Sequence, residues 1–176
     1  MAFLKHISLF LSLCLSLICL GGCAGYRLGP TNDQIAGDVS IEVKHFQNLT
    51  IEPRLSAYLM TPLRRAIQQD GTFRLCSDRD SSDYILEGTI TDFDRNGIGS
   101  YPGNVSVHVD YYITISVHAI LRERATGRVL LEQDFEGSTV FPLGKDQTSA
   151  ERQAIPIAME NLAHNIASVL GDGKIK

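Results

Sequence analysis

VSVHVDYYITISVHAIL, residues 105–121, is the longest regular pattern in this sequence, because every odd-numbered position carries an apolar or aromatic side chain. The even-numbered positions from 106 to 118 carry Ser, His, Asp, Tyr and Thr instead. Alternate side chains of a strand point to opposite faces of a sheet, so the pattern predicts one long strand with a single buried face. About 17 residues at ~3.3 Å each would reach roughly 55 Å, so we expect this strand to bend or to overhang the domain.

Shorter strands are predicted on both sides of this segment. The dipeptide Thr126-Gly127 turns the chain back into a strand over 129–135, which makes a long hairpin. Upstream, residues 39–44 alternate with period two, 73–76 form a short strand and 84–93 a longer one. A turn-rich connection rich in Gly and Asn is expected over residues 94–104.

Two helices are predicted from apolar residues that recur every three or four positions. The first has Asn48 to Thr50 as its cap, Pro53 in its first turn, and its end at Asp70-Gly71. The second starts at the capping-box spacing Thr148 to Glu151 and ends over 171–173. The expected buried positions are Leu55, Leu59, Leu63, Ala66 and Ile67 in the first helix, and Ile155, Met159, Leu162, Ile166 and Val169 in the second. The interior proline Pro62 predicts a kink, and Pro156 predicts a kink or a broken first turn.

These elements predict an α+β fold in one domain, residues 39–172, with two helices packed on one face of a mixed or antiparallel sheet of four to five strands. The long strand has its apolar residues on one side only, which fits a sheet covered on a single face. Its other face is polar with few charges. Two interpretations of that face stay open: a hydrated surface, or a surface that lies against another polar wall.

Residues 1–22 have the composition of a lipoprotein signal peptide. Lys5 precedes an apolar run over 7–20, which is too short for a permanent membrane span, and Leu20-Gly-Gly-Cys23 places small residues before a cysteine. We expect acylation of Cys23, a tether over 23–38, and an anchor on the periplasmic face of the outer membrane, since Ala24 rather than Asp follows the cysteine. The alternatives are an ordinary signal peptide with a chance cysteine and a retained membrane anchor.

The charge of the chain disfavours nucleic acid as a partner. The sequence contains 16 Lys and Arg and 20 Asp and Glu; without Lys5, 15 basic residues face 20 acidic ones, and no long basic run occurs. After processing, Cys76 is the one cysteine left without a lipid. It is interpreted as a buried strand thiol, with a reactive or intermolecular role as the alternative.

Motifs for catalysis, cofactors and metals are missing from the sequence. We find no Walker A loop, His-Glu-x-x-His, Gly-x-Ser-x-Gly or paired-cysteine spacing, so we expect neither an enzyme nor a cofactor. His108 and His118 are ten residues apart on one strand face, roughly 33 Å, and do not share a metal. Asp78, Asp80 and Asp83 form a polar loop, which is either a solvated turn or an oxygen-rich calcium site.

Two basic groups are candidates for binding phosphate. Arg122, Arg124 and Arg128 flank the predicted hairpin tip, and Lys145 lies just before the final helix. Charges at such places usually serve solubility, but guanidinium and ammonium groups also pair well with phosphate. The phosphorylated head of lipopolysaccharide is the abundant anion that a periplasmic lipoprotein would meet.

Several short segments resemble the LPS-assembly lipoprotein family (LptE). They are CAGYRL (23–28), VKHFQNLTIEPRL (43–55), DYILEGTI (83–90), DYYITI (110–115), TGRVL (126–130) and the stretch from 154 onward. The resemblance implies a sheet with two helices on one face, lodged in the lumen of the outer-membrane β-barrel LptD. It also implies that the pair places lipopolysaccharide in the outer leaflet and that the lipoprotein binds lipopolysaccharide.

The resemblance also points to site residues. Lys145 matches a basic residue of the family in position and context, and Arg95 lies in the region of a second one, separated from the following strand by an insertion. The alternative function is a structural or secretion-accessory lipoprotein that forms homo-oligomers beneath a pore.

Overall fold

Six strands form one mixed sheet in the computed structural model, which describes residues 37–76, 81–99, 110–142 and 147–172. The elements are β1 (Val39–Val43), β2 (Gln47–Asn48), α2 (Leu55–Asp70), β3 (Phe73–Leu75), β4 (Tyr84–Ile98), β5 (Asp110–Glu123), β6 (Val129–Pro142) and α3 (Gln147–Gly171). The strand order is β3-β1-β4-β5-β6, and the short β2 pairs with β4. The predicted α+β fold is confirmed, with six strands instead of four or five.

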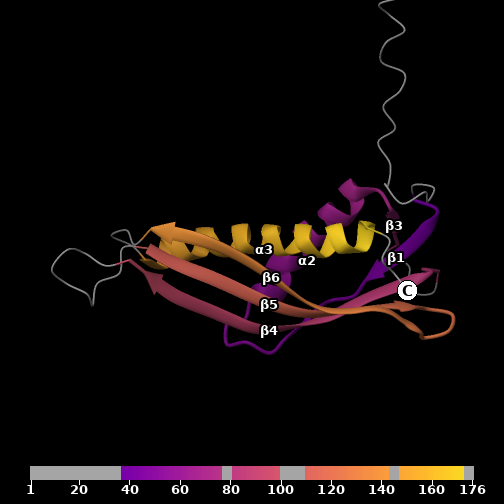
Figure 1. Cartoon of the computed structure of the whole chain (residues 1–176), viewed down its shortest axis with the longest axis horizontal. Coiled ribbons are helices and arrows are strands. Elements are labelled where there is room, and N and C mark those ends of the chain that lie inside the picture. Colours follow the sequence, from indigo (N-terminus) through magenta and orange to yellow (C-terminus); the bar gives the residue numbers. More distant parts are fainter. Residues whose placement is uncertain (1–36, 77–80, 100–109, 143–146, 173–176) are drawn as a thin grey trace, which may run out of the picture.

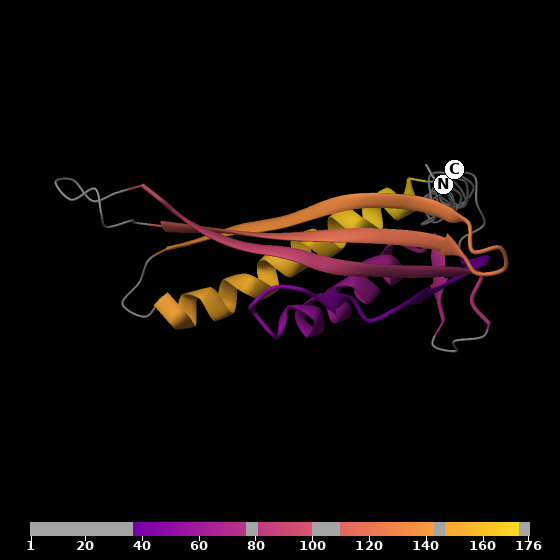
Figure 2. The same cartoon turned by 90° about the horizontal axis from the view of Figure 1, so that it is seen from below.

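Both helices lie on the same face of this curled sheet, with α3 running along β5 and β6 (Figure 1) and α2 beside it (Figure 2). Parallel pairing joins β1 to β3 and β4, and antiparallel pairing joins β4, β5 and β6. Within the described part of the chain, no helix is long and apolar enough to cross a membrane.

The central strand β5 has the register that the sequence predicts. Its odd-numbered residues Ile113, Ile115, Val117, Ala119 and Leu121 are fully buried under the helices. The even-numbered residues from Thr114 to Ile120 are only half-buried. Residues 105–109 of the predicted strand lie outside the described residues.

The two neighbours of β5 are longer than the sequence predicts. β4 continues to Ile98 instead of ending at 93, and β6 continues to Pro142 instead of 135. Asp110 at the start of β5 lies opposite both of these ends. The backbone groups of a central strand need hydrogen-bond partners on both sides. The added ends of β4 and β6 show no apolar alternation of their own, and pairing with β5 keeps them extended.

The predicted cap of the first helix is wrong. Asn48 belongs to β2, and α2 begins at Leu55 after Arg54, which makes no side-chain capping bond. The end of the helix is as predicted, since Gly71 adopts the left-handed conformation (φ +78°) and its N–H donates to the carbonyl of Ile67. The five predicted buried residues of α2 are all buried.

The predicted capping box of the second helix is also wrong, because α3 begins at Gln147 and Thr148 already lies inside it. The predicted stripe is buried from Ile155 to Ile166, and Val169 is half-buried against the core. Both helices continue through Pro62 and Pro156, and the kinks at these positions stay predictions.

Close contact between α3 and β6 requires the glycine at position 137. A Cβ there would lie 2.4 Å from both the carbonyl oxygen of Ala158 and the Cβ of Leu162, which is shorter than any real contact. On either side of this glycine, Asn161 donates to the carbonyl of Ser138 (2.9 Å) and Asn165 to that of Glu136 (2.8 Å). The helix therefore also satisfies carbonyl groups of the strand at the edge of the sheet.

We predict that Leu162→Ala lowers the free energy of unfolding by about 2–5 kcal/mol, because it leaves a cavity between α3 and the sheet. Urea denaturation of the purified domain measures the loss. Leu49→Ala is the matched control, because Leu49 is 64% exposed and should change stability by less than about 0.5 kcal/mol. Equal stabilities of the two variants would contradict the packing described above.

Candidate functional site

The basic residues that the sequence singles out lie in two separate places. Arg122, Arg124 and Arg128 lie at the β5–β6 hairpin end of the sheet, whereas Arg95 lies opposite Ile113 toward the other end. Ile113 and Arg122 are nine positions apart along β5, roughly 30 Å at ~3.3 Å per residue. Lys145 lies outside the described residues. Arg95 therefore does not form one phosphate site with the arginines at the hairpin end.

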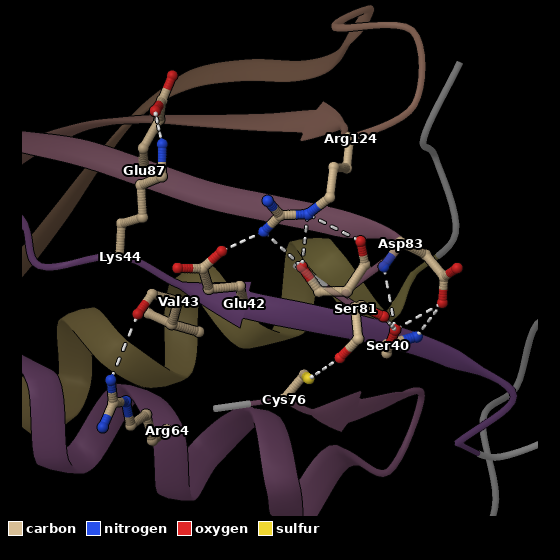
Figure 3. Close-up of polar contacts among 11 residues, drawn as sticks. Ser40, Glu42, Val43, Lys44, Arg64, Cys76, Ser81, Asp83, Glu87 and Arg124 are labelled. Carbon is tan, nitrogen blue, oxygen red and sulfur yellow. Dashed lines mark hydrogen bonds and ion pairs between the residues drawn. The ribbon is translucent and has the colours of Figure 1, made fainter. Parts of the chain in front are cut away.

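Arg124 is held inside a polar cluster that joins three segments (Figure 3). Its guanidinium pairs with Glu42 of β1 and donates to the carbonyl (2.9 Å) and hydroxyl (2.7 and 3.0 Å) of Ser82. Its backbone N–H donates to the carbonyl of Asp83 (2.8 Å). With these contacts Arg124 links the end of β5 to β1 and to the start of β4, which is a structural role.

Asp83 closes the same cluster from the other side. Its carboxylate accepts hydrogen bonds from the hydroxyl (2.6 Å) and the backbone N–H (2.8 Å) of the buried Ser40. These bonds hold the pKa of Asp83 below its ordinary value, because they favour the charged form. Of the three carboxylates in the candidate calcium site, that of Asp83 is therefore already hydrogen-bonded to Ser40. Asp78 and Asp80 lie outside the described residues. Over the described ranges, no group of His, Cys, Asp and Glu side chains has the geometry of a metal site.

Cys76 lies directly after β3 rather than within it. The side chain is half-buried, and its Sγ is 3.1 Å from the hydroxyl oxygen of Ser81 (Figure 3). The expectation of a buried strand thiol is therefore wrong, since Cys76 is only half-buried and β3 ends one residue earlier at Leu75.

Arg122 and Arg95 also have carboxylate partners. The Nε of Arg122 is 2.8 Å from Glu87, which Lys44 also contacts at 3.3 Å. These two cations, the arginine first, hold the pKa of Glu87 below its ordinary value. Arg95 pairs with Glu151 in the first turns of α3, so it ties β4 to that helix. A phosphate at either arginine would have to compete with a carboxylate.

Arg128 is the most accessible of the candidate arginines in the described chain. Its side chain is 65% exposed, and its nearest carboxylate, on Glu123, is 3.9 Å away. A pocket of about 360 Å³ at the same end is lined by Val39, Tyr84, Asp83, Glu123 and Arg124, among others. Two carboxylates against one guanidinium do not suit an anion there, so an anion at this end would meet Arg128 outside the pocket.

The face of the sheet that points away from the helices, here called the outer face, is more acidic than β5 alone suggests. Opposite residues of paired strands share a face. Asp92 and Asp94 of β4 lie opposite Ser116 and Thr114. Three exposed carboxylates of β6 lie opposite Ile120, His118 and Ser116; they are Glu132, Asp134 and Glu136. The pattern of β5 gives no sign of this set, because the carboxylates lie on two other strands and only the register brings them to one face.

His118 lies among these carboxylates. Its Nδ1 is 2.7 Å from Asp134 and its Nε2 is 3.3 Å from Glu132. The hydrogen bond to Asp134, followed by that to Glu132, raises the pKa of His118 above its ordinary value of 6.5. As the sequence suggests, His118 is a half-exposed strand residue.

Comparison with known proteins identifies a family and a fold. A family model described as "LptE: Lipopolysaccharide-assembly" matches residues 39–170. No curated protein matches this sequence.

Three solved structures have a similar fold. The hypothetical protein CT253 of Chlamydia trachomatis is 8% identical, with a TM-score of 0.56, over 77% of this chain and 97% of that one. Protein XCC0632 of Xanthomonas campestris is 17% identical, with a TM-score of 0.54, over 85% and 90%. A minor lipoprotein of Acinetobacter baumannii is 12% identical, with a TM-score of 0.54, over 77% and 94%.

We predict a pH-dependent ion pair at His118. Below pH 6.5 the imidazole is charged in both the folded and the unfolded chain, so the contribution of its carboxylate contacts to stability is fully present. That contribution is lost as the pH rises through the raised folded-state pKa. Asp134→Asn should move the pKa of His118 back toward 6.5, as followed by NMR titration of the imidazole protons.

Asp92→Asn is the control for this titration, since Asp92 lies on the same face but opposite Ser116. If both variants shift the pKa of His118 equally, the general charge of the outer face sets it rather than the contact with Asp134.

Proposed function

This chain belongs to the family described as LptE: Lipopolysaccharide-assembly, and from that premise we propose that it is an outer-membrane lipoprotein that lodges in the β-barrel LptD. In this proposal the pair places lipopolysaccharide in the outer leaflet, and the lipoprotein binds lipopolysaccharide itself. The proposed role is one of binding rather than catalysis.

The match of the family model over residues 39–170 is the observation that carries the proposal. This range begins with the first residue of β1 and ends one residue before the end of α3. It therefore spans every described helix and strand rather than one local motif. The lipoprotein of similar fold from Acinetobacter baumannii agrees with this proposal at the level of the fold alone.

The outer face supports a polar partner. Its middle carries Ser, Thr and His together with exposed carboxylates, among them Asp92, Asp94 and Asp134. The lumen of an outer-membrane barrel is polar and hydrated. A polar sheet face packs against such a wall without leaving buried groups unpaired, because water and side chains of the wall satisfy them.

Anchoring follows from the N-terminal segment in this proposal. Residues 1–22 are the signal peptide, and the lipid on Cys23 holds the chain at the periplasmic face of the outer membrane. The tether over 23–38 reaches at most about 55 Å when extended, at ~3.4 Å per residue. That length allows the domain to sit inside a partner while its lipid remains in the leaflet.

We predict that affinity purification of the acylated full-length chain from detergent-solubilised membranes recovers an outer-membrane barrel in a one-to-one complex. Native mass measurement of the solubilised complex gives the ratio. Depletion of the protein should lower the level of that barrel and cause lipopolysaccharide to accumulate inside the cell.

A homo-oligomer without a barrel in the same measurement would instead support the accessory-lipoprotein alternative. Unchanged barrel levels and unchanged permeability after depletion would also count against the proposal.

We predict that Lys145→Ala weakens lipopolysaccharide binding by about 1 kcal/mol, roughly fivefold, as expected for one surface charge. Lys145→Asp should weaken it further, because repulsion replaces attraction, and the melting temperature should not change. Binding of purified variants is measured at two salt concentrations, since screening reduces the effect of an exposed charge.

Arg128 and Arg124 provide a matched pair for this experiment. Arg128→Ala should weaken binding without loss of stability, because its side chain is 65% exposed. Arg124→Ala should lower the melting temperature, because it leaves Glu42 and Ser82 without their partner. If Lys145→Asp binds as tightly as the wild type at low salt, Lys145 serves solubility only.

A further inference from the structure

Two aliphatic side chains project from the turn between β2 and α2. Leu49 is 64% exposed and Ile51 is 97% exposed, which makes them the two most exposed large apolar side chains in the described residues. Single exposed apolar residues are common on protein surfaces. Here two of them lie on one turn, and residues 49–51 are called the apolar knuckle below.

The knuckle is held rigidly by hydrogen bonds within its own turn. The side-chain oxygen of Asn48 accepts from the backbone N–H (3.1 Å) and the hydroxyl (2.8 Å) of Thr50. The side-chain nitrogen of Asn48 donates to the carbonyl of Glu52 (2.6 Å), and the N–H of Glu52 donates to the hydroxyl of Thr50 (3.3 Å). These bonds fix the backbone on both sides of each apolar residue.

The turn is also fixed to the core at both ends. The N–H of Leu49 donates to the carbonyl of Ile90 in β4 (3.1 Å). On the other side, the hydroxyl of the buried Ser56 donates to the carbonyl of Phe46 (2.7 Å), whose side chain is fully buried. A rigid apolar projection loses little conformational entropy when a partner covers it, which is the property of an anchor residue in an interface.

The edge of β4 beside the knuckle shows which kind of contact fits. In the described part of the chain, no strand pairs with this edge beyond Ile90. Addition of a partner strand there is hindered, because the carboxylate of Asp94 already accepts from the N–H of Arg95 (2.8 Å). The knuckle therefore offers side-chain packing rather than main-chain pairing.

Neither a lipid surface nor a second copy of this chain fits the knuckle well. Stable binding to a membrane surface takes a larger apolar area with basic flanking residues, and the knuckle offers two apolar side chains followed by Glu52. Two facing knuckles would bury far less than the roughly 1,200 Å² of a specific dimer. An aliphatic side chain in the pocket beside Arg124 would take water away from two carboxylates, those of Asp83 and Glu123, which is unfavourable.

We propose that the knuckle inserts Leu49 and Ile51 into an apolar recess in the otherwise polar wall of the barrel partner and anchors the complex there. This inference rests on the proposed function, since it requires a barrel that surrounds the domain. It assigns barrel binding to the knuckle and leaves lipopolysaccharide binding to the basic residues elsewhere.

The test compares Ile51→Ser, and the double variant Leu49→Ser with Ile51→Ser, with the control Ile157→Ser. Ile157 is 51% exposed on α3, so the control makes the same chemical change on another surface. Each full-length acylated variant is co-expressed with the barrel, and the ratio of recovered barrel to lipoprotein is measured. We expect a loss of about tenfold for the double variant, as for a hot-spot residue pair, and no loss for the control. Melting temperatures and lipopolysaccharide binding should stay at the wild-type values.

Several results would overturn the inference. These are an unchanged barrel ratio for the double variant, an equal loss for Ile157→Ser, or a loss accompanied by a lower melting temperature. Loss of binding of the non-acylated domain to anionic phospholipid vesicles, with the barrel ratio intact, would assign the knuckle to lipid instead. If the wild-type chain recovers no barrel, both the proposed function and this inference fail, whereas recovery that is insensitive to the knuckle overturns the inference alone.

Discussion

Burial of the odd-numbered face of β5 under α3 is the interaction on which the other features depend. The strand contributes a row of fully buried side chains from Ile113 to Leu121, and Met159, Leu162 and Ile166 of the helix are buried in the same core. Such a layer requires a close approach of helix and sheet, which Gly137 permits because any side chain there would collide with α3. Once this layer is formed, the positions of β4 and β6 on either side of β5 are fixed by backbone pairing.

The same layer determines how the polar groups are distributed. Because α3 lies on one face, the carboxylates of β4 and β6 are directed to the other face, where Asp134 and Glu132 of β6 contact His118. At the hairpin end, Arg124 and Asp83 close the sheet between β1, β4 and β5 through buried or half-buried contacts. The protein therefore uses several of its charges to hold strands together, and fewer remain to meet a ligand.

The surfaces suited to a protein wall and to phosphate lie apart in this structure. A rigid apolar turn beside β4, an acidic outer face and an exposed arginine at the hairpin tip lie on different parts of one small domain. Contacts with a protein wall are favoured where side chains are apolar or can share water, and contacts with phosphate are favoured where a cation lacks a close carboxylate. In the proposed function, the two kinds of contact therefore fall on different surfaces of the domain.

The sequence by itself determined the class of fold, since the period-two pattern of residues 113–121 and the helical spacing from Leu55 to Ile67 depend only on which face must be buried. Its resemblance to a family pointed in the same direction as the family model. The limits of β4 and β6, and the place of Asn48 in β2 rather than at a helix cap, were decided by tertiary pairing, because neighbours across the sheet supply hydrogen bonds that local propensity does not encode. The candidate arginines are visible in the sequence, but their availability is not. Whether a guanidinium faces solvent, as Arg128 does, or a carboxylate from a distant strand, as Arg124 does with Glu42, follows from contacts between residues far apart in the chain.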